Sequence, residues 1–492
     1  MKNKLDKFFK ISERGSNFRI EIIAGLTTFF AMAYIIFVNP DQVAAGGAGG
    51  WLVAEGADPA VMGKIWNAVY VASILVAAIG TLLYALYAKL PYAQACGLGL
   101  NSFFCTTFVA GAYFGGKDVI QGYQEGLTII LLSGILFLIL SITGAREYIA
   151  KSLPECLKKA ISAGIGLFIA FIGFQNVDFI QDNPYTLVQL FNFHDTIENA
   201  PSFLDAMRGY ETPDFAASSM AAVLIAFIGL ILIAILEKFK VKGSVIISIG
   251  ASTVLYYILT WQAPSFDINQ IGQSFADFGE IGIIGAFKGF GTLGTLGVVN
   301  IIVLVVTFCL VDMFDTIGTL YGTAAQADML DENGDPIDVN KAMACDSIAT
   351  VTGAVLGTST CTTFVESAAG VGAGGRSGFA SLVTSLCFLV CLFLTPLAAI
   401  VPSCATAPAL IYVGVLMLKG FAKIDMSDVS NAVPAFLTVV MMPLTYSISN
   451  GIAIGAMSYV IIRACTGKYT KKDIVATIIA VLFAVRFIMV TM

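Results

Sequence analysis

The chain has 492 residues, of which 57% are hydrophobic and only 12% are charged, and its mean hydropathy is +0.85. An ordinary soluble domain carries roughly 25% charged residues, so the composition argues against a water-soluble globular enzyme, and the high hydrophobicity excludes disorder. The net charge of −6 and the lack of a basic stripe argue against a nucleic-acid partner. The remaining class is a polytopic membrane protein in a lipid bilayer, with room for about a dozen or more spans of ~20 residues.

Apolar stretches long enough to cross a bilayer recur along the whole chain. Helices are the form expected for them, because lipid cannot satisfy exposed backbone groups. The end of the chain decides between fourteen and fifteen spans, because 429–465 could be two crossings or one interrupted pair, and 473–491 could be a span or an in-plane helix. We predict spans at 20–38, 66–88, 93–112, 125–144, 160–180, 217–236, 243–260, 294–323, 342–357, 359–375, 378–400, 404–420, 429–446, 448–465 and 473–491.

Lys and Arg residues gather in loops of one parity, which predicts a cytoplasmic N-terminus in the plasma membrane. The loops of opposite parity, at 40–65, 181–216 and 261–293, are long and poor in bases. The acidic stretch at 328–338 on the cytoplasmic side is tolerable, because acids count little in this rule. The bases that set the orientation are Lys2, Lys4, Lys7, Lys10, Arg14, Arg19, Arg146, Lys151, Lys158, Lys159, Lys238, Lys240, Lys242, Arg463, Lys468, Lys471 and Lys472.

The third and tenth apolar runs, at 93–112 and 359–375, are short, polar and rich in glycine or threonine. Extended backbone leading into a half-helix suits them better than a lipid-facing helix, and such backbone is allowed only where it is buried or lines a cavity. Interrupted segments at matching places in two halves indicate an inverted-repeat transporter with a midplane site. Because seven is an odd number of crossings, a repeat of seven segments places the second half in the opposite orientation in the membrane.

Few charges fall deep inside the predicted spans, and those that do are functional candidates by default. Asp312 and Asp315 share one helix face at i and i+3, and two close acids in a medium of low dielectric cannot both ionise cheaply. One of them can therefore carry a proton. Glu366 begins the tenth, broken segment, where it can pair with N–H groups of a planar ligand, and phenylalanines nearby could stack on the same ligand.

Structural roles compete with these functional ones. Asp315 could bridge helices as readily as contact a ligand, and Asp346 is five residues past Lys341, which favours a role at a helix start. Asn101 could cap a half-helix, Arg486 could snorkel to a headgroup, and phenylalanines usually pack. Only two acids, those at 312 and 366, resist the structural explanation, because neither has a base nearby in the sequence.

Metal and enzyme motifs do not appear. The ten cysteines are scattered without a C-x-x-C motif, and His194 is expected to be exposed in a polar loop. The glycine-rich stretches at 46–50 and 370–375 lack the Lys-Ser/Thr of a phosphate-binding loop. We therefore expect no enzyme activity, no metal and no cofactor.

Several motifs together resemble one transporter family. The stretch TSTCTTFVESAAGVGAGGRSG at 358–378 looks like the signature of the AzgA-like purine permeases, a branch of the nucleobase:cation symporter 2 (xanthine/uracil permease) family. The resemblance runs in order over nearly the whole chain. The further motifs are EIIAGLTTFFAMAYIIFVNP at 21–40, ACGLGLNSFF at 95–104, LVDMFDTIGTL at 310–320, ATAPALIYVGVLM at 405–417 and MMPLTYSISNGIAIG at 441–455.

The resemblance implies fourteen transmembrane segments in two inverted seven-segment repeats, so one of the last three apolar runs would be either less than a full crossing or an addition. Segments 1–4 and 8–11 would form a core domain, and segments 5–7 and 12–14 a gate domain. A homodimer is compatible with this architecture. The expected boundaries are 1–19 for an N-terminal arm, 20–144 and 294–400 for the core, and 160–260 and 404–492 for the gate.

The resemblance also implies a site between segments 3 and 10 that binds a purine base, with hypoxanthine and guanine first and adenine or xanthine as further candidates. Transport would be driven by the proton gradient. The matching substrate-binding residues are Glu366, Asp312, Asn101, Phe364, Val365, Phe103 and Phe104, and the matching proton-coupling residues are Asp312, Asp315 and Glu366. Cys96 stands where members usually have proline, and Cys361 replaces a commoner aliphatic residue, which puts the fine geometry in doubt.

Rival functions are an anion or bicarbonate transporter of the same architecture, a sensor, a channel and, more distantly, a membrane enzyme. An anion site would favour a base at the ends of the half-helices, whereas the expected site offers acids and Arg376 belongs to a cytoplasmic turn. A sensor would usually carry an added soluble domain. A channel would bind without coupling to protons.

Overall fold

The computed structural model describes residues 2–143, 154–183, 185–212, 215–241, 243–264, 267–326, 329, 336–364, 366–398, 400–470 and 473–489. The predicted spans form helices in nearly the predicted places. Those of the first half are α2 (Phe18–Met32) and α3 (Ile35–Val43), α5 (Pro59–Leu83), α6 (Leu98–Phe104), α8 (Val119–Thr143), α10 (Glu155–Gln175), α13 (Met220–Lys238) and α14 (Ser244–Thr260). Those of the second half are α17 (Val298–Gln326), α18 (Val339–Leu356), α19 (Ser367–Gly372), α20 (Gly378–Cys391), α22 (Ser403–Leu418), α23 (Val429–Leu444) and α24 (Ile448–Cys465).

The described helices have the length and composition of membrane spans. Seven of them, counted over the described residues, are long and apolar enough to cross a bilayer, and shorter apolar helices of 10–17 residues occupy most of the other predicted positions. The strands are few and short. The protein is therefore an all-α polytopic membrane protein, as the composition predicts.

Contacts between helices repeat in the two halves of the chain. Helix α8 packs against α17 and α18, just as α20 packs against α2 and α5. Helix α22 packs against α13 and α14, just as α10 packs against α23 and α24, and α10 also packs against α22. This exchange of equivalent partners is the pattern of two interlocked repeats of seven segments, which confirms the inverted-repeat fold.

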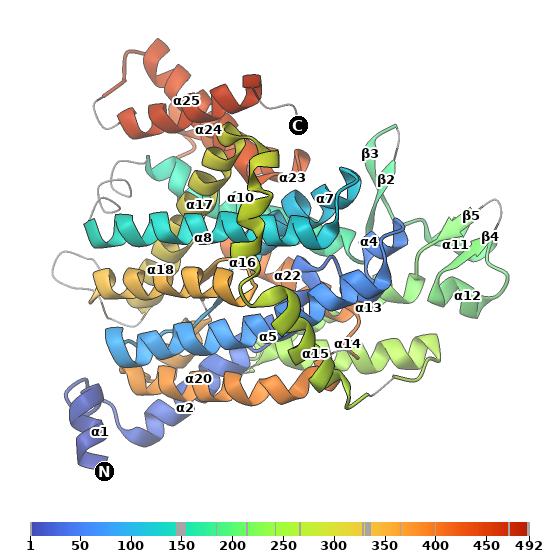
Figure 1. The fold of residues 1–492 in the computed structure, drawn as a ribbon, viewed down its shortest axis with the longest axis horizontal. Helices are drawn as coiled ribbons and strands as arrows, with labels where there is room; N and C mark the ends of the chain where they lie inside the picture. The colour runs from blue at the N-terminus through green and yellow to red at the C-terminus, as the bar shows by residue number, and fades with distance from the viewer. Residues whose placement is uncertain are drawn as a thin grey trace.

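The helices separate into two groups by the same contacts. We call α2, α3, α5, α6, α8 and α17–α20 the core group, in which α8, α18, α5 and α20 lie side by side (Figure 1). We call α10, α13, α14 and α22–α24 the gate group. Glycines allow close packing inside it: a Cβ atom on Gly166 of α10 would lie 2.9 Å from the carbonyl oxygen of Gly414 on α22. Small residues are typical of such helix contacts in membranes.

The long predicted loops carry structure of their own. Two hairpins, β2 (Ile180–Asn183) with β3 (Leu187–Leu190) and β4 (Tyr210–Thr212) with β5 (Phe215–Ala217), project beside α11 (Phe193–Glu198) and α12 (Phe203–Arg208). They lie at the opposite end of the molecule from the N-terminal helix α1 (Lys2–Phe9) (Figure 1). The shorter connecting helices are α4 (Trp51–Ala54), α7 (Ala110–Phe114), α15 (Gln270–Asp277), α16 (Gly285–Lys288) and α21 (Thr395–Ala398).

The end of the chain resolves the ambiguity left by the sequence. Residues 429–465 form two helices, α23 and α24, which turn at Tyr446 with a positive φ of 50°. Helix α25 (Ile474–Met489) follows and packs against α24 and α17. It lies outside the two sets of seven, so the last apolar run is the addition.

Candidate functional site

Two short strands, one from each half of the chain, pair within the core group. Strand β1 (Gln94–Cys96) runs antiparallel to β6 (Cys361–Thr363), with Ala95 opposite Thr362. The Phe364 N–H group extends the pairing by donating to the Ala93 carbonyl at 3.0 Å. Each strand leads into a short helix, α6 or α19. The predicted extended backbone followed by a half-helix is therefore present in both segments, buried in protein as such backbone must be.

A cavity of about 140 Å3 lies where these strands and half-helices meet the gate group. It is far smaller than the roughly 300–1,000 Å3 pockets of drug-sized ligands, so it suits one small ring system. On the core side its walls come from α6, α17, β6, the residue before α3 and the residues between β6 and α19, and on the gate side they come from α10 and α22. The lining residues are Tyr34, Leu98, Gly99, Ile169, Asp315, Thr319, Thr362, Thr363, Phe364, Glu366, Val413, Leu416 and Met417.

Glu366 is the carboxylate at the start of α19, and it lines this cavity as the sequence predicts. Its position is fixed by the buried Tyr34 hydroxyl, which donates a hydrogen bond of 2.6 Å to Glu366 Oε1. Tyr34 lies between α2 and α3. The bond therefore connects the first segment to the tenth, and it holds the carboxylate at the cavity wall.

Asp315 lines the cavity together with Thr319, which follows it by one turn of α17. Asp312 lies on the same helix but is not among the described lining residues. It is buried between α17 and α18, where the Thr350 hydroxyl donates to its Oδ2 atom at 2.8 Å. The structure thus separates the two acids that the sequence placed on one helix face: one meets the cavity, and the other meets the neighbouring helix.

Asp346 mirrors Asp312 from the facing helix. It is fully buried two turns into α18, where it accepts a hydrogen bond from Thr316 of α17 and another of 2.8 Å from the Gln94 amide of β1. The expected role at a helix start is therefore wrong, because α18 begins at Val339. Asp346 instead anchors the strands. Lys341 is close to Asp346 in the sequence and therefore suggested the helix-start role. In the structure, however, the Lys341 ammonium pairs with Asp338 at 2.7 Å.

The predicted residues of α6 lie in the packing behind the cavity. Asn101 is buried, accepts a hydrogen bond from Ser359 and donates to Gln42 at 3.4 Å, so it connects α6 to α3 and to the residues before β6. The Phe103 ring packs 5.0 Å from that of Phe308, and Phe104 packs against Phe108 and Tyr123. Of the three phenylalanines predicted for the site, Phe364 is the one found among the described residues that line the cavity. Val365 lies outside the described residues.

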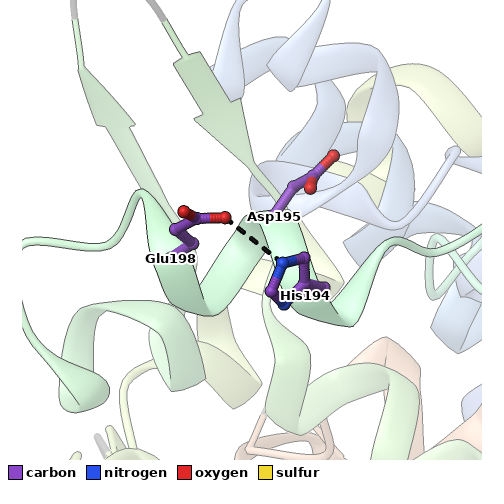
Figure 2. Close-up of side chains that lie close together, drawn as sticks. All are labelled: His194, Asp195 and Glu198. Atoms are coloured by element: carbon purple, nitrogen blue, oxygen red, sulfur yellow. Dashed lines mark ion pairs between the residues drawn. The ribbon is translucent and has the colours of Figure 1, made fainter.

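One exposed cluster of potential metal ligands lies elsewhere, on α11. Figure 2 shows His194 Nε2 facing Glu198 Oε2, at 3.3 Å, one turn apart, beside Asp195. Asp195 is already hydrogen-bonded to the Asn192 side chain, which caps this helix. The arrangement is that of an ordinary surface pair, and it accords with the expected exposure of His194.

A second, larger cavity of about 610 Å3 lies at the end of the molecule that carries the hairpins. Core residues such as Asp41 and Trp66 and gate residues such as Tyr257 line it. Asp41 connects the groups, because it accepts hydrogen bonds from Trp66 Nε1 at 2.7 Å and from Thr406 Oγ1 of α22 at 3.3 Å. The boundary between core and gate therefore has a broad mouth at one end and the small acidic cavity farther in.

Comparison with known proteins places this geometry in a family. The model of a permease family, Xan_ur_permease, matches residues 19–197 and 203–454. The chain belongs to this family. The permease is 38% identical over 481 residues to the guanine/hypoxanthine permease PbuG of Bacillus subtilis, covering 98% of this chain and 99% of that protein. It is 35% identical over 486 residues to the adenine permease AdeP of Escherichia coli, covering 99% and 96%.

These matches confirm the resemblance read from the motifs, and they make the permease a transporter and not an enzyme. Among solved structures, the transmembrane domain of a cyanobacterium bicarbonate transporter, BicA, superposes with a TM-score of 0.55 at 15% identity, covering 87% of this chain and 96% of that one. At this identity the likeness shows the fold alone. The substrate contacts of individual residues stay predictions.

Proposed function

We propose that the permease imports purine bases together with protons, with hypoxanthine and guanine as the first substrates and adenine and xanthine as further candidates. The single observation that carries the proposal is the small cavity at the paired half-helices, which holds Glu366 and Asp315. The names of the relatives PbuG and AdeP support the purine class. The site of action is the cell membrane, with the N-terminus in the cytoplasm.

Recognition follows from the chemistry of the cavity wall. A purine presents N–H groups along its edges, and a carboxylate accepts such bonds strongly because charge-assisted hydrogen bonds are the stronger kind. Glu366 accepts from one edge of the base, and Asp315 with Thr319 meets another. Phe364 and the apolar side chains of α10 and α22 cover the flat faces of the ring. Asn101 holds the half-helix α6 in place from behind.

Proton coupling follows from the uncompensated acids. The described lining contains two carboxyl groups and no Lys, Arg or His, so a proton is the cheapest means of neutralising one of them when water is excluded. Asp312 and Asp346 form a second acidic pair behind the strands. Each accepts a hydrogen bond from a threonine of the facing helix, Asp312 from Thr350 and Asp346 from Thr316. We assign the exchangeable proton to the cavity acids, because these meet the substrate.

Transport in this proposal is a movement of the core group against the gate group. The cavity takes its walls from both groups, so a relative displacement exposes the occupied site first to one side and then to the other. The Asp41–Thr406 hydrogen bond joins α3 to α22 and must break during this movement. A rocking or elevator-type motion is the form expected of inverted-repeat transporters.

The fold is shared with a bicarbonate transporter, which keeps an anion transporter as the second candidate. The lining favours the purine. An anion site would need a cation or unopposed helix N-termini, whereas the Arg376 guanidinium donates to the Val371 and Gly375 carbonyls.

Competition for uptake tests the proposed substrate class. The purified permease is reconstituted into proteoliposomes with an alkaline interior, and uptake of radiolabelled hypoxanthine is measured with excess guanine, adenine, xanthine, uracil or bicarbonate. We expect guanine to suppress uptake and uracil and bicarbonate to leave it unchanged. Competition by bicarbonate, or the same uptake without a pH gradient, would contradict the proposal.

A further inference from the structure

The large cavity at the hairpin end of the molecule has the size of a binding site. Its volume of about 610 Å3 falls within the roughly 300–1,000 Å3 of pockets that hold small ligands. It lies on the same boundary as the small cavity, because residues of both the core and the gate groups line it. The proposed transport site is the small cavity, which leaves the larger one without a role.

Polar groups in fixed orientations line the core side of the large cavity. Trp66 Nε1 donates to Asp41 Oδ1 at 2.7 Å, so the carboxylate of Asp41 is oriented before any ligand arrives. The Asn67 amide is held in the same way, because its Nδ2 atom donates to Asp277 at 2.8 Å and its Oδ1 atom accepts from Ser274 at 3.1 Å. A side-chain amide has a second N–H group and a second lone pair, so Asn67 can still bind a ligand.

The gate side adds aromatic rings and a second acid. Tyr256 and Tyr257 of α14 are half-buried in the lining, and the Tyr257 hydroxyl donates to the Ile400 carbonyl at 2.8 Å. Asp178 follows the end of α10. The described lining residues include these two acids, Asp41 and Asp178, and no Lys, Arg or His. Such a lining suits an uncharged planar molecule, whose N–H groups the acids accept and whose faces the rings cover, and it repels anions.

The helices that run between the two cavities place them in line. On the α3 side, Tyr34 lines the small cavity and Asp41 lines the large one, seven positions later (34 to 41). On the α10 side, Ile169 and Asn176 do the same at the same spacing (169 to 176). Helix α22 also contributes to both linings. At a rise of about 1.5 Å per residue, the two cavities are roughly 10 Å apart along the core–gate boundary.

We propose that the large cavity is a second binding site for the transported base, from which the base passes to the Glu366 site farther in. The ligand is an uncharged planar base with ring N–H groups. Asp178 accepts a hydrogen bond from one such group, Asn67 donates to a ring nitrogen or carbonyl, and Tyr256 covers one face of the ring. This inference rests on the proposed purine import, because the same base must occupy both sites in turn.

Tryptophan fluorescence can report on this site. The chain has three tryptophans, and Trp66 is the one among the described residues that line the large cavity. Trp51→Phe with Trp261→Phe leaves it as the single reporter, and the replaced side chains are 36% and 80% exposed. We expect hypoxanthine to change the Trp66 fluorescence saturably in the purified single-tryptophan chain. The change should persist when Glu366→Gln is added, because binding at the mouth does not use the small cavity.

Asp178→Asn, added to the single-tryptophan chain that carries Glu366→Gln, tests the proposed contact. The half-saturating hypoxanthine concentration should rise about tenfold or more, because hydrogen bonds to charged groups are the stronger ones. Asp182→Asn is the matched control, since Asp182 is exposed on β2 and is not among the described lining residues. It should leave that concentration unchanged. An unchanged value for Asp178→Asn as well would overturn the assignment.

Uptake measurements separate a binding defect from a folding defect. With Glu366 intact, Asp178→Asn should take up hypoxanthine within about twofold of the wild-type rate at saturating concentration, whereas a loss of that uptake would make Asp178 a structural residue and overturn its role. A fluorescence change that disappears with Glu366→Gln would show that Trp66 senses the small cavity, and it would overturn the second site while the proposed import stands. A single-tryptophan chain that neither responds to hypoxanthine nor takes it up, alongside a wild type that also fails to take it up, would contradict the proposed function as well.

Discussion

At the scale of single residues, the hydrogen bond from Tyr34 to Glu366 determines where the cavity carboxylate lies. Tyr34→Phe removes this donor without changing the shape of the ring. A hydrogen bond to a charged group is worth about 1.5–3 kcal/mol, so we expect the KM for hypoxanthine to rise by roughly tenfold or more. Uptake kinetics in proteoliposomes measure this change.

Tyr113→Phe is the matched control for this variant. Its hydroxyl donates at 2.6 Å to the Glu55 carbonyl, in a contact between α7 and the loop after α4. The KM should stay at the wild-type value there. If Tyr34→Phe also left the KM unchanged, the orientation of Glu366 would not depend on Tyr34.

The sequence predicts site residues only where their type is rare. Glu366 and Asp315 are recognisable because acids are scarce in apolar spans. Tyr34 is not, because nothing in its own neighbourhood distinguishes it from other tyrosines, and only its place in the 21–40 motif marks it. Asn101 and Phe103 belong to a half-helix in which each residue turns by about 100° from the last, so the sequence cannot say which of them meets the cavity.

At the scale of elements, the half-helix α19 depends on its close approach to α2. A Cβ atom at Gly370 would overlap Thr28 Oγ1 and lie 2.6 Å from the Ala24 carbonyl oxygen. We expect Gly370→Ala to push α19 away from α2, which costs about 1–3 kcal/mol as overpacking does, and to reduce purine uptake strongly. The thermal unfolding temperature in detergent should fall.

Gly372→Ala provides the control within the same helix, because nothing lies within 4 Å of a Cβ atom there. It should unfold at the wild-type temperature and transport normally. Equal behaviour of the two variants would show that the α19–α2 contact is not tight.

The sequence predicts that segments 3 and 10 are broken, but not that their strands pair. Glycine and threonine content reveals the interruption, whereas pairing joins residues about 267 positions apart (Ala95 with Thr362) and depends on the whole fold. The two residues that depart from the family pattern, Cys96 and Cys361, are explained by the same strand pairing. Cys96 lies directly opposite Cys361 in the register, and both thiols are buried and free, so the two replacements meet at one point of the core.

At the scale of the whole molecule, the distribution of bases predicts which side each end faces. Cys465 is exposed at the end of α24, in the segment that also carries Lys468. An impermeant maleimide should label it in inside-out membrane vesicles and not in intact cells. Tyr185→Cys, at the tip of the β2–β3 hairpin where the native side chain is 93% exposed, should show the opposite pattern. The reverse result for both would invert the topology.

Most of the fold could be predicted from composition and the spacing of apolar runs. The seven-run offset between the interrupted segments predicts the inverted repeat, which the exchanged helix contacts confirm. The structured hairpins at 180–217 and the extra helix α25 could not be predicted in the same way, because they lie outside the symmetric unit and its hydropathy pattern.

The most direct test of the central claim is gradient-driven uptake by Glu366→Gln. Glutamine keeps the size of the side chain but can neither accept as a carboxylate nor carry a proton. Uptake of radiolabelled hypoxanthine into proteoliposomes with an alkaline interior should fall to the level of empty liposomes for this variant, while the wild type accumulates the base. Wild-type accumulation by Glu366→Gln would contradict the account.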